Sequence, residues 1–529
     1  MGDVRISELL KDAGKGDTIL FYPGTYHGPY VLEEVHGAID QPVVIMGLNT
    51  GLDQQSIIDG ESEPGIALEK FAFLLRSCSW ISIENFSIKN CWTDLIYAEN
   101  VSYLSLKKCN MTGGRRALFA TGRESHHFLV ENCRWEQDER VWTHAGDYTW
   151  DELHHGIHHY YNGSIFQGSG ISGVFVIRDN HIQNTFNAFR LSPVNEGVMD
   201  RLACSNGEIY RNTIINTSDN VLEPEVSVFN LHYYHNHMIN GHAFISITEV
   251  TGGPVYIYGN TAVSLPESGD GWTVFKISNR RNGLTAPLNI FNNSWQVDFN
   301  VVGSSDHIWS NDHVNYFNNA SVMEVHDTFG IYNLGEENNF DYNCSNLPFP
   351  ALLTGNGFEK HGIVADPLFS HAYGNDFRLK ANSPCIDKGR VADNLILSYA
   401  GEAPDIGAYD NGRLVEGIPF RFMNPPAEVS FKENPRITRH RVHSNGITLW
   451  FSVPLDPQSA GSVNFSLKQG DETIDLEIAK GSDDPYRLEL SAGKKLPGGE
   501  ARLNLDRRPL GINKMPLTGW ASTIPVTFY

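Results

Sequence analysis

The sequence lacks long apolar segments. No stretch approaches the roughly 18 consecutive apolar residues that span a membrane, and Met1-Gly2-Asp3-Val4 does not begin the basic-then-apolar pattern of a signal peptide. Membrane anchoring finds no support, and we expect a soluble chain or a mature chain whose signal has been removed. Apolar residues still make up 41% of the 529 residues, and aromatic residues 11%. That content excludes a disordered or collagen-like chain and predicts a large core with two or more folding units.

Basic residues are few. The chain has 40 Lys and Arg against 62 Asp and Glu, for a net charge of −22. The deficit lies in residues 1–412, with 25 basic and 49 acidic side chains, whereas residues 413–529 have 15 and 13. Nucleic-acid binders neutralise the phosphate backbone with Lys and Arg, so a body this acidic is expected to have no nucleic-acid partner.

Cysteine is scarce too, and its positions indicate a repeat. Seven cysteines without a CxxC motif predict neither a disulfide framework nor a zinc ribbon, and no phosphate-loop or HExxH zinc motif is present. Cys109 and Cys133 are 24 residues apart, and Asn85 precedes Cys109 by another 24. Each follows a short strand-like segment. A buried structural role is therefore expected for both cysteines.

The same strand-then-asparagine pattern recurs along the chain. It is found in residues 176–180, 209–212, 233–236, 255–260 and 290–293. A period of roughly 20 to 30 residues with alternating strands and no helical periodicity is typical of a solenoid, here a parallel β-helix. Asparagine suits the corners because it tolerates the left-handed conformation, and its amides can bond from coil to coil.

These patterns resemble a known family, the right-handed parallel β-helix proteins that act on polysaccharides. Residues 16–26 are similar to the first coil of chondroitinase-B-like and alginate-lyase-like enzymes, and residues 366–369, 376–389 and 405–408 are similar to their final coils. The resemblance covers about residues 5–410. We therefore predict an all-β chain with a right-handed parallel β-helix catalytic domain in residues 1–412, a fold that does not itself specify the reaction.

Residues 413–529 differ from the repeat. Alternating segments such as 447–453 and 465–468, separated by Gly, Asp and Pro turns, predict an Ig-like antiparallel β-sandwich. We expect an accessory domain that packs against or caps the solenoid. Carbohydrate binding is the alternative.

The resemblance implies that the last strand of each coil lines the substrate groove. Because side chains alternate along a strand, Phe189 and Leu191 should point inward and Arg190 outward, with Asn187 at the preceding turn. In the next coil Leu222 and Pro224 should point inward, with Glu223 and Glu225 outward. The same outward stripe should include Tyr97, Glu99, Phe119, Thr121, Ser192, Ser246, Thr248, Lys276 and Ser278.

Three acids on this stripe predict glycoside hydrolysis. Alternate strand residues lie about 6 to 7 Å apart, and a pair of carboxyls about 5 to 9.5 Å apart, one protonated and one ionised, hydrolyses glycosidic bonds. We predict Glu223 and Glu225 as the catalytic pair, assisted by Asp219. Arg190 and Lys276 should hold an anionic group of the sugar. Solvated carboxylates or a Ca²⁺ site remain alternatives.

A polysaccharide lyase is the second hypothesis. The chondroitinase-B-like lyases pair a Glu-x-Glu calcium site with a Lys shortly after it and an Arg on the following coil. Glu223-Pro224-Glu225 matches the first element, but residues 226–230 contain no Lys, and the next groove strand offers Ser246 and Thr248 instead of Arg. A non-catalytic carbohydrate-binding solenoid is the third hypothesis.

A long insertion separates Cys133 from Asn180. Loops over a solenoid groove commonly bind sugar through aromatic faces and polar tips. The residues predicted to bind substrate here are Trp142, Trp150, His154, His155, His158 and Tyr160. His155 or Tyr160 could also serve a lyase as base. His154 and His158 have the i, i+4 spacing of a helical zinc site, but Gly156 argues against a helix, and no metal is predicted.

The sequence as a whole predicts a secreted or periplasmic enzyme that depolymerises an acidic or sulfated polysaccharide. The substrate is its expected partner, and neither nucleic acid nor membrane is. No cofactor is expected to be required, although Ca²⁺ binding is compatible with Glu223 and Glu225.

Overall fold

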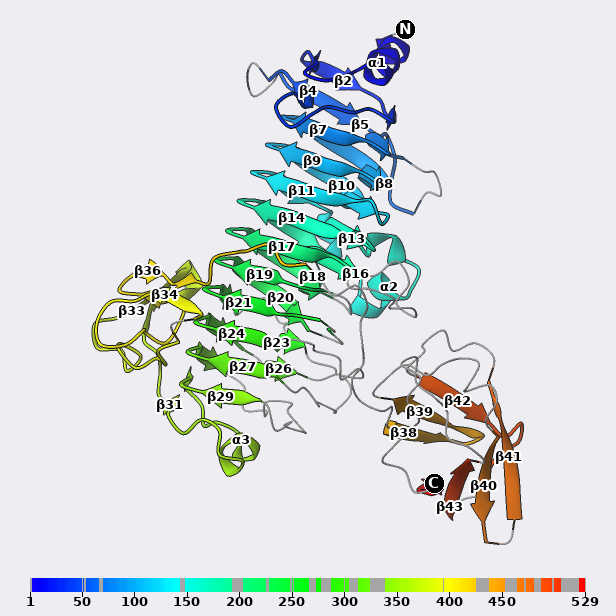
Figure 1. Cartoon of the computed structure of the whole chain (residues 1–529), viewed down its shortest axis with the longest axis vertical. Coiled ribbons are helices and arrows are strands. Elements are labelled where there is room, and N and C mark those ends of the chain that lie inside the picture. Colours follow the sequence, from blue (N-terminus) through cyan, green and yellow to red (C-terminus); the bar gives the residue numbers. More distant parts are fainter. Residues whose placement is uncertain are drawn as a thin grey trace.

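The structure is a computed structural model (Figure 1). It describes residues 2–49, 51, 54–65, 70–142, 148–192, 203–224, 228–247, 250, 252–265, 273–276, 287–298, 300–303, 313–323, 338–392, 394–424, 437–451, 464–470, 472–479, 487–496, 499–505 and 523–528.

The described chain is a right-handed parallel β-helix followed by antiparallel strands, as predicted. Three parallel sheets run the length of the helix, and every coil contributes one strand to the first of them. Sheet 1 consists of β1 (Thr18–Phe21), β4 (Val43–Gly47), β7 (Ser79–Glu84), β9 (Ser102–Lys107), β11 (His126–Glu131), β14 (Gly173–Arg178), β17 (Ser205–Tyr210), β19 (Leu231–Tyr234), β21 (Val255–Tyr258), β24 (Leu288–Phe291), β27 (Val314–Phe317) and β29 (Asn339–Asp341).

Sheets 2 and 3 are joined by four long strands that bend from one sheet into the other: β8 (Ser87–Glu99), β10 (Asn110–Thr121), β18 (Thr213–Pro224) and β20 (His237–Ser246). Sheet 2 adds β2 (Gly24–Tyr26), β5 (Ser56–Asp59), β12 (Arg134–Glu136), β15 (His181–Thr185), β22 (Thr261–Val263), β25 (Ser294–Val297), β28 (Ala320–Met323), β30 (Cys344–Ser345) and β31 (Ile363–Val364). Sheet 3 adds β3 (Tyr30–Glu33), β6 (Phe73–Arg76), β13 (Ser164–Ser169), β16 (Phe189–Ser192), β23 (Thr273–Lys276) and β26 (Asn300–Gly303).

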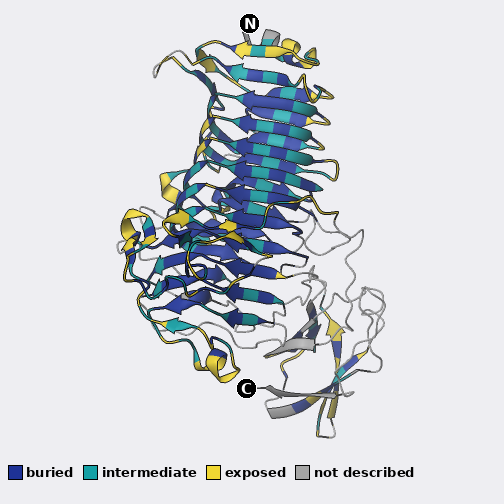
Figure 2. Ribbon diagram, turned by 60° about the vertical axis from the view of Figure 1, so that its left-hand side comes forward, coloured by how far each residue is buried: buried dark blue, intermediate teal, exposed yellow. Residues whose placement is uncertain are grey.

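The core is the inside of the coils. Inward side chains such as Ile83, Leu106, Val130 and Ile177 stack in register along sheet 1 and are fully buried. Figure 2 shows the alternation as stripes of buried and partly exposed residues across the strands. Each coil buries its apolar face against its neighbours, which is why the short strands are stable only as a stack.

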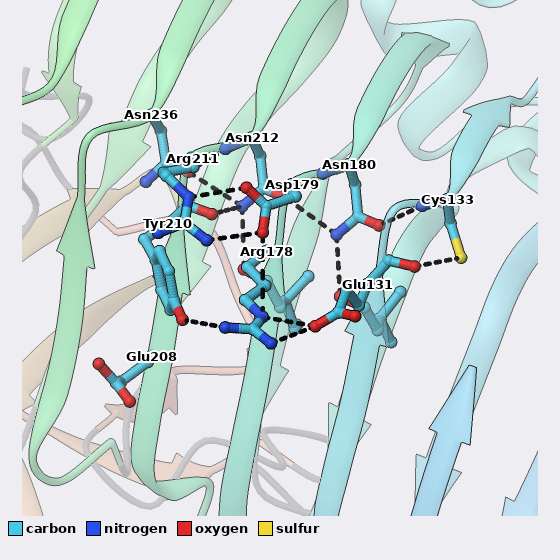
Figure 3. A network of polar contacts seen from close by, with 12 residues as sticks. Glu131, Cys133, Arg178, Asp179, Asn180, Glu208, Tyr210, Arg211, Asn212 and Asn236 are labelled. Carbon is cyan, nitrogen blue, oxygen red and sulfur yellow. Dashed lines mark hydrogen bonds and ion pairs between the residues drawn. The ribbon is translucent and has the colours of Figure 1, made fainter. Parts of the chain in front are cut away.

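The asparagine corner predicted from the repeat is confirmed (Figure 3), but the left-handed conformation belongs to the residue before each asparagine. A ladder of buried side chains runs through Asn180, Asn212, Asn236, Asn260, Asn293, Asn319 and Asn343. Each amide donates to the next side-chain oxygen at 2.9–3.2 Å, and the last one donates to the buried Glu359. The left-handed residue is the one before each ladder position, such as Arg211 at φ 52°.

Asn85 therefore does not align with Cys109 and Cys133. Asn85 occupies the left-handed position, and Phe86 takes the place that Cys109 and Cys133 occupy in later coils. All seven cysteines are free and buried, in line with a structural role. The backbone N–H of Cys133 donates to Asn180 and so begins the ladder.

Helices close the two ends of the stack. Helix α1 (Gly2–Lys11) buries Leu10 against the first coil, and α3 (Ala351–Gly355) buries Leu353 at the other end. Within the part of the chain that the structure describes, no helix is long and apolar enough to cross a membrane.

Residues 366–424 do not form further coils, which corrects the prediction for the closing motifs. They form two short antiparallel hairpins, β32 (Phe369–His371) with β33 (Asp376–Leu379) and β35 (Tyr409–Asp410) with β36 (Arg413–Leu414), and a further antiparallel pair, β34 (Ile396–Ser398) with β37 (Glu416–Gly417), whose strands flank the second hairpin in the sequence. The predicted boundary after residue 412 lies between the two strands of the last hairpin. The segments that contain these motifs pack on the outside of the helix.

We call residues 385–424 the strap, because they run back along the corner of the helix. The strap bonds successively earlier coils, from Asn318 with Arg390, through His235 with Val415, to Asn206 with Met423. Parallel aromatic rings stack along this corner, with neighbours 4.7–5.4 Å apart: Tyr210, Tyr234, Tyr258, Phe291 and Phe317. The strap packs on the part of the stack from Tyr234 to Phe317.

The C-terminal strands are antiparallel, as predicted. They are β38 (Ile437–His443), β39 (Gly446–Phe451), β40 (Phe465–Gln469), β41 (Glu472–Ile478), β42 (Arg487–Ser491), β43 (Gly499–Leu505) and β44 (Thr523–Phe528). Their order is β38-β39-β42-β41-β40-β43-β44, around a separate core that includes Leu449, Phe465 and Leu503. Its function as an accessory domain stays a prediction.

Candidate active site

The predicted outward stripe exists as one continuous row on sheet 3. Strand pairing aligns Tyr97, Phe119, Gln167, Arg190, Glu223, Ser246 and Lys276, one from each successive coil. Their strand neighbours Phe189, Leu191 and Leu222 point inward and are fully buried, so the predicted alternation is confirmed.

Glu223 lies at the centre of the site and is only 5% exposed. Its Oε2 accepts a hydrogen bond from Asn187 Nδ2 at 2.7 Å and lies 3.3 Å from Arg190 Nε, while Oε1 accepts one from Asn220 Nδ2 at 3.2 Å. A buried carboxylate is costly unless it is paired and hydrogen-bonded. These donors stabilise the ionised form of Glu223.

Asp219 precedes Glu223 on the same strand and is in the opposite electrostatic situation. Burial raises its pKa to about 6, and the charge of Glu223 adds to the rise; the ammonium of Lys276 and a hydrogen bond from Trp150 act in the other direction. Trp150 Nε1 donates to Asp219 Oδ1 at 3.0 Å. One strand therefore presents a carboxyl that tends to hold a proton near one held as an anion.

Trp150 reaches Asp219 because the insertion folds into a short helix, α2 (Trp150–His154). Thr149 and Glu152 form a reciprocal capping box at its start, which fixes the first turn. The indole stacks on His154 at 4.6 Å and on the more distant His242 at 6.2 Å. Burial and then the neighbouring His155 lower the pKa of His154 to about 4, so its imidazole is neutral at neutral pH.

The end of α2 agrees with the expectation drawn from Gly156, that no helix carries both His154 and His158. That glycine lies after α2, which ends at His154, so it does not prevent the turn. His158 lies outside α2, and the two histidines do not share a helical face. His158 bonds the Tyr160 hydroxyl at 2.7 Å and packs on Tyr148.

The predicted substrate-binding residues thus fall into two groups. Arg190, Lys276, Trp150 and His154 surround the Asp219 and Glu223 carboxyls. The others do not: Trp142 is buried, His155 is exposed beside Asp151, and His158 and Tyr160 form the separate contact described above.

Asn187 needs a correction, because it is 1% exposed and cannot be a direct substrate contact. Its amide nitrogen donates to Glu223, and its Oδ1 accepts the backbone N–H of Asn220. It positions the carboxylate. Glu225, Thr248 and Ser278 lie outside the described residues, so the predicted pairing of Glu223 with Glu225 stays a prediction, and the two acids of the site that the structure describes are Asp219 and Glu223.

Four residues of the site were missed from the sequence. Asn220 bonds Glu223, and Asn162 accepts a hydrogen bond from Arg190 at 3.2 Å. His242 precedes Ala243, the pairing partner of Asn220, which places it beside Asp219 on the next coil. Gln167 completes the row. The alternation rule could have found Gln167 and His242, whereas it places Asn220 inward with Leu222, and Asn162 lies in the irregular insertion.

Comparisons with known proteins return β-helix enzymes among solved structures. A pectate lyase shares 13% identity with a TM-score of 0.34, covering 76% of this chain and 90% of its own. An endo-xylogalacturonan hydrolase from Aspergillus tubingensis shares 10% identity with a TM-score of 0.38, covering 64% and 86%. A polysaccharide lyase from Pseudopedobacter saltans shares 14% identity with a TM-score of 0.38, covering 66% and 93%.

No family model and no curated protein matches the chain. The solved structures are polysaccharide-degrading enzymes by name and include both lyases and a hydrolase. At this level of similarity, the reaction has to be inferred from the side chains of the site.

Proposed function

We propose that this protein is a secreted or periplasmic glycoside hydrolase that depolymerises an acidic polysaccharide. The observation that carries the proposal is the pair of carboxyls on β18. Asp219, with its pKa raised to about 6, is the general acid, and Glu223, stabilised as an anion by two amide donors and the charge of Arg190, is the base or nucleophile. Glycosidases need one carboxyl of each kind.

Arg190 and Lys276 are the reason for proposing an acidic substrate. They flank Glu223 on the row, one on the coil before and one two coils after it. Arg190 is oriented by Asn162 and by Glu223 itself, so its guanidinium can meet an anionic sugar group without moving far.

A lyase is the second candidate, supported by the neutral His154 beside these two cations. In that reaction the cations would neutralise a uronate carboxylate, and a neutral imidazole would remove the neighbouring proton. Its low pKa makes His154 a weak base, which favours the hydrolase.

A calcium-dependent mechanism does not fit Glu223. Both of its oxygens accept amide hydrogen bonds, and a guanidinium lies against one of them, whereas Ca²⁺ needs free carboxylate oxygens. Among the described residues, no group of three or more His, Cys, Asp or Glu could hold a metal ion. We therefore expect a chelator such as EDTA to leave turnover unchanged. A loss that added Ca²⁺ restores would contradict this.

The test is incubation with uronate-containing, sulfated and neutral polysaccharides, following reducing ends and the ultraviolet absorbance of unsaturated products together. Hydrolysis gives reducing ends without absorbance. Asp219→Asn and Glu223→Gln should each lower kcat by about 100-fold or more. Glu208→Gln, a half-buried carboxyl on sheet 1, is the matched control. Absorbance would establish the lyase, and binding without turnover would establish a non-catalytic solenoid.

A further inference from the structure

The row that contains Glu223 continues toward the N-terminal coils as an aromatic surface. Gln167, Phe119 and Tyr97 follow Arg190 on successive coils, and Phe71 packs against Tyr97. Neighbouring strands lie about 4.8 Å apart, so this surface extends the site by three coils, or roughly 14 Å.

The rings of this surface are arranged differently from the aromatic stack under the strap. There, neighbouring rings are within 11° of parallel and cover one another's faces. Here the planes of Phe71 and Tyr97 meet at 63°, and those of Tyr97 and Phe119 at 66°. In an edge-to-face pair, the edge of one ring contacts one face of the other, so the remaining faces are not covered by the pair itself. Tyr97 and Phe119 are also partly exposed; because Arg116 covers one face of the Phe119 ring, a ligand would meet the other face.

Two of the cations along this stretch, Arg116 and Arg76, are paired within the protein. The Arg116 guanidinium bonds Asp94 and lies 3.8 Å from the Phe119 ring centroid, and Arg76 lies 3.4 Å from Glu99. The adjacent row offers hydroxyls, from Thr121 and Ser169, for polar contacts. Paired charges, aromatic faces and hydroxyls favour an uncharged sugar, whose apolar face stacks while its hydroxyls bond at the side.

We propose that Tyr97 and Phe119 form binding subsites for uncharged sugars, so that the substrate is a mixed polysaccharide with an acidic sugar near Arg190 and Lys276 and uncharged sugars toward the N-terminal coils. The inference rests on the proposed function for the position of the cleaved bond. It adds a substrate class that the catalytic pair alone does not specify.

The test compares three polysaccharides: gellan, in which uronates are separated by uncharged sugars, polygalacturonate, in which every sugar is acidic, and an uncharged galactan. The expected preference, in kcat/KM, is for the mixed polymer. Tyr97→Ala and Phe119→Ala should each raise KM for it about tenfold with kcat within about twofold, the pattern of lost binding.

Two further variants separate binding from folding. Tyr97→Leu and Phe119→Leu keep an apolar side chain of similar burial without a ring face, and they should show the same rise in KM. Tyr103→Ala removes a half-buried ring from sheet 1 in the same coil as Phe119 and should leave KM unchanged. Unchanged KM in the Tyr97 and Phe119 variants, or equal efficiency on polygalacturonate, would overturn the proposal.

Affinity electrophoresis in gels that contain the same polysaccharides makes the test independent of the proposed reaction. If the protein cleaves none of them but the mixed polymer retards it, and Tyr97→Ala abolishes the retardation, the subsites stand and the hydrolase fails. If cleavage occurs but the variants are retarded like the wild type, the hydrolase stands and the subsites fail. If the wild-type protein neither cleaves gellan nor is retarded by it, the proposal of the subsites is overturned.

Discussion

The buried Asp219 links the chemistry of the site to pH. Because burial and the charge of Glu223 raise its pKa to about 6, the carboxyl keeps its proton in weakly acidic solution and releases it as the pH rises further. A residue in this state can protonate a leaving group, and the same burial makes its ionisation unfavourable for the fold.

Activity should therefore fall as the pH rises above about 6, by about tenfold per pH unit in kcat/KM once Asp219 is ionised. Lys276 lowers the pKa of Asp219, so Lys276→Met should shift this limb to higher pH. The measurement is kcat/KM against pH for both proteins. The idea is wrong if the limb stays in place or moves to lower pH.

Removal of the Asp219 carboxyl should lower activity but raise the stability of the fold at neutral pH. The folded pKa of about 6 is above the ordinary value of 3.8, so the folded chain binds the proton more tightly and loses stability as pH rises from about 4 to 6. The Asp219→Asn variant has no carboxyl to ionise at this position. The difference in the free energy of unfolding between variant and wild type should therefore be about 1–3 kcal/mol more favourable to the variant at pH 7 than at pH 4. Urea denaturation at both values measures this, with Glu359→Gln as a second buried carboxyl whose pKa is raised by burial, to about 7. An equal difference at both pH values would count against it.

Residue-level patterns predicted which side chains form the outward row, but not which residues from other segments contact the carboxyls of the site. The alternation of Phe189, Arg190 and Leu191 determines which side chains point outward in any parallel coil, so Arg190 and Glu223 could be placed beside each other. The protonation of Asp219 could not be predicted. It depends first on the burial that raises the pKa of Asp219, which only the folded chain shows, and the opposing hydrogen bond comes from Trp150, 69 positions away.

Single elements decide whether the site is complete. Helix α2 is one turn long, and such a turn has little stability of its own, so its capping box matters more than in a longer helix. The indole of Trp150, the first residue of α2, then bonds Asp219. The sequence signal for this helix, Thr149 followed by Glu152, is visible once Gly156 is placed after the helix.

Thr149→Ala should loosen α2 by about 1 kcal/mol, the usual effect of losing a cap, without changing the global stability much. We expect kcat/KM to fall several-fold and hydrogen exchange to rise in residues 150–161. Asp151→Ala, on the same turn but without a capping bond, is the control. If both variants behave alike, the cap does not position Trp150.

At the scale of the whole molecule, the strap changes how the solenoid holds together. A solenoid is stabilised mainly by contacts between neighbouring coils. The strap instead joins coils that are far apart, from the one with Asn318 to the one with Asn206, and it covers Tyr258, Phe291 and Phe317. Local periodicity predicted the coils. It could not predict the strap, because its partners lie up to 217 positions earlier in the sequence.

Removal of residues 385–529 should expose the aromatic stack and weaken the C-terminal coils more than the N-terminal ones. We expect the urea unfolding of the truncated chain to separate into two transitions, whereas the full chain unfolds its helix in one. A chain cut after residue 436 keeps the strap and serves as control. A single, unshifted helix transition after both truncations would show that the strap is dispensable.

The strap is also synthesised after the coils that it covers. Ribosomes deliver the chain from its N-terminus, and the coils with Tyr234, Tyr258, Phe291 and Phe317 leave the exit tunnel well before Val415 and Arg421. During that interval the stacked rings face the cytosol or the translocation machinery uncovered, as an apolar surface open to chaperones and to other nascent chains. The sheet 3 row also precedes the strap in the sequence, so it is synthesised before the strap can cover the aromatic stack.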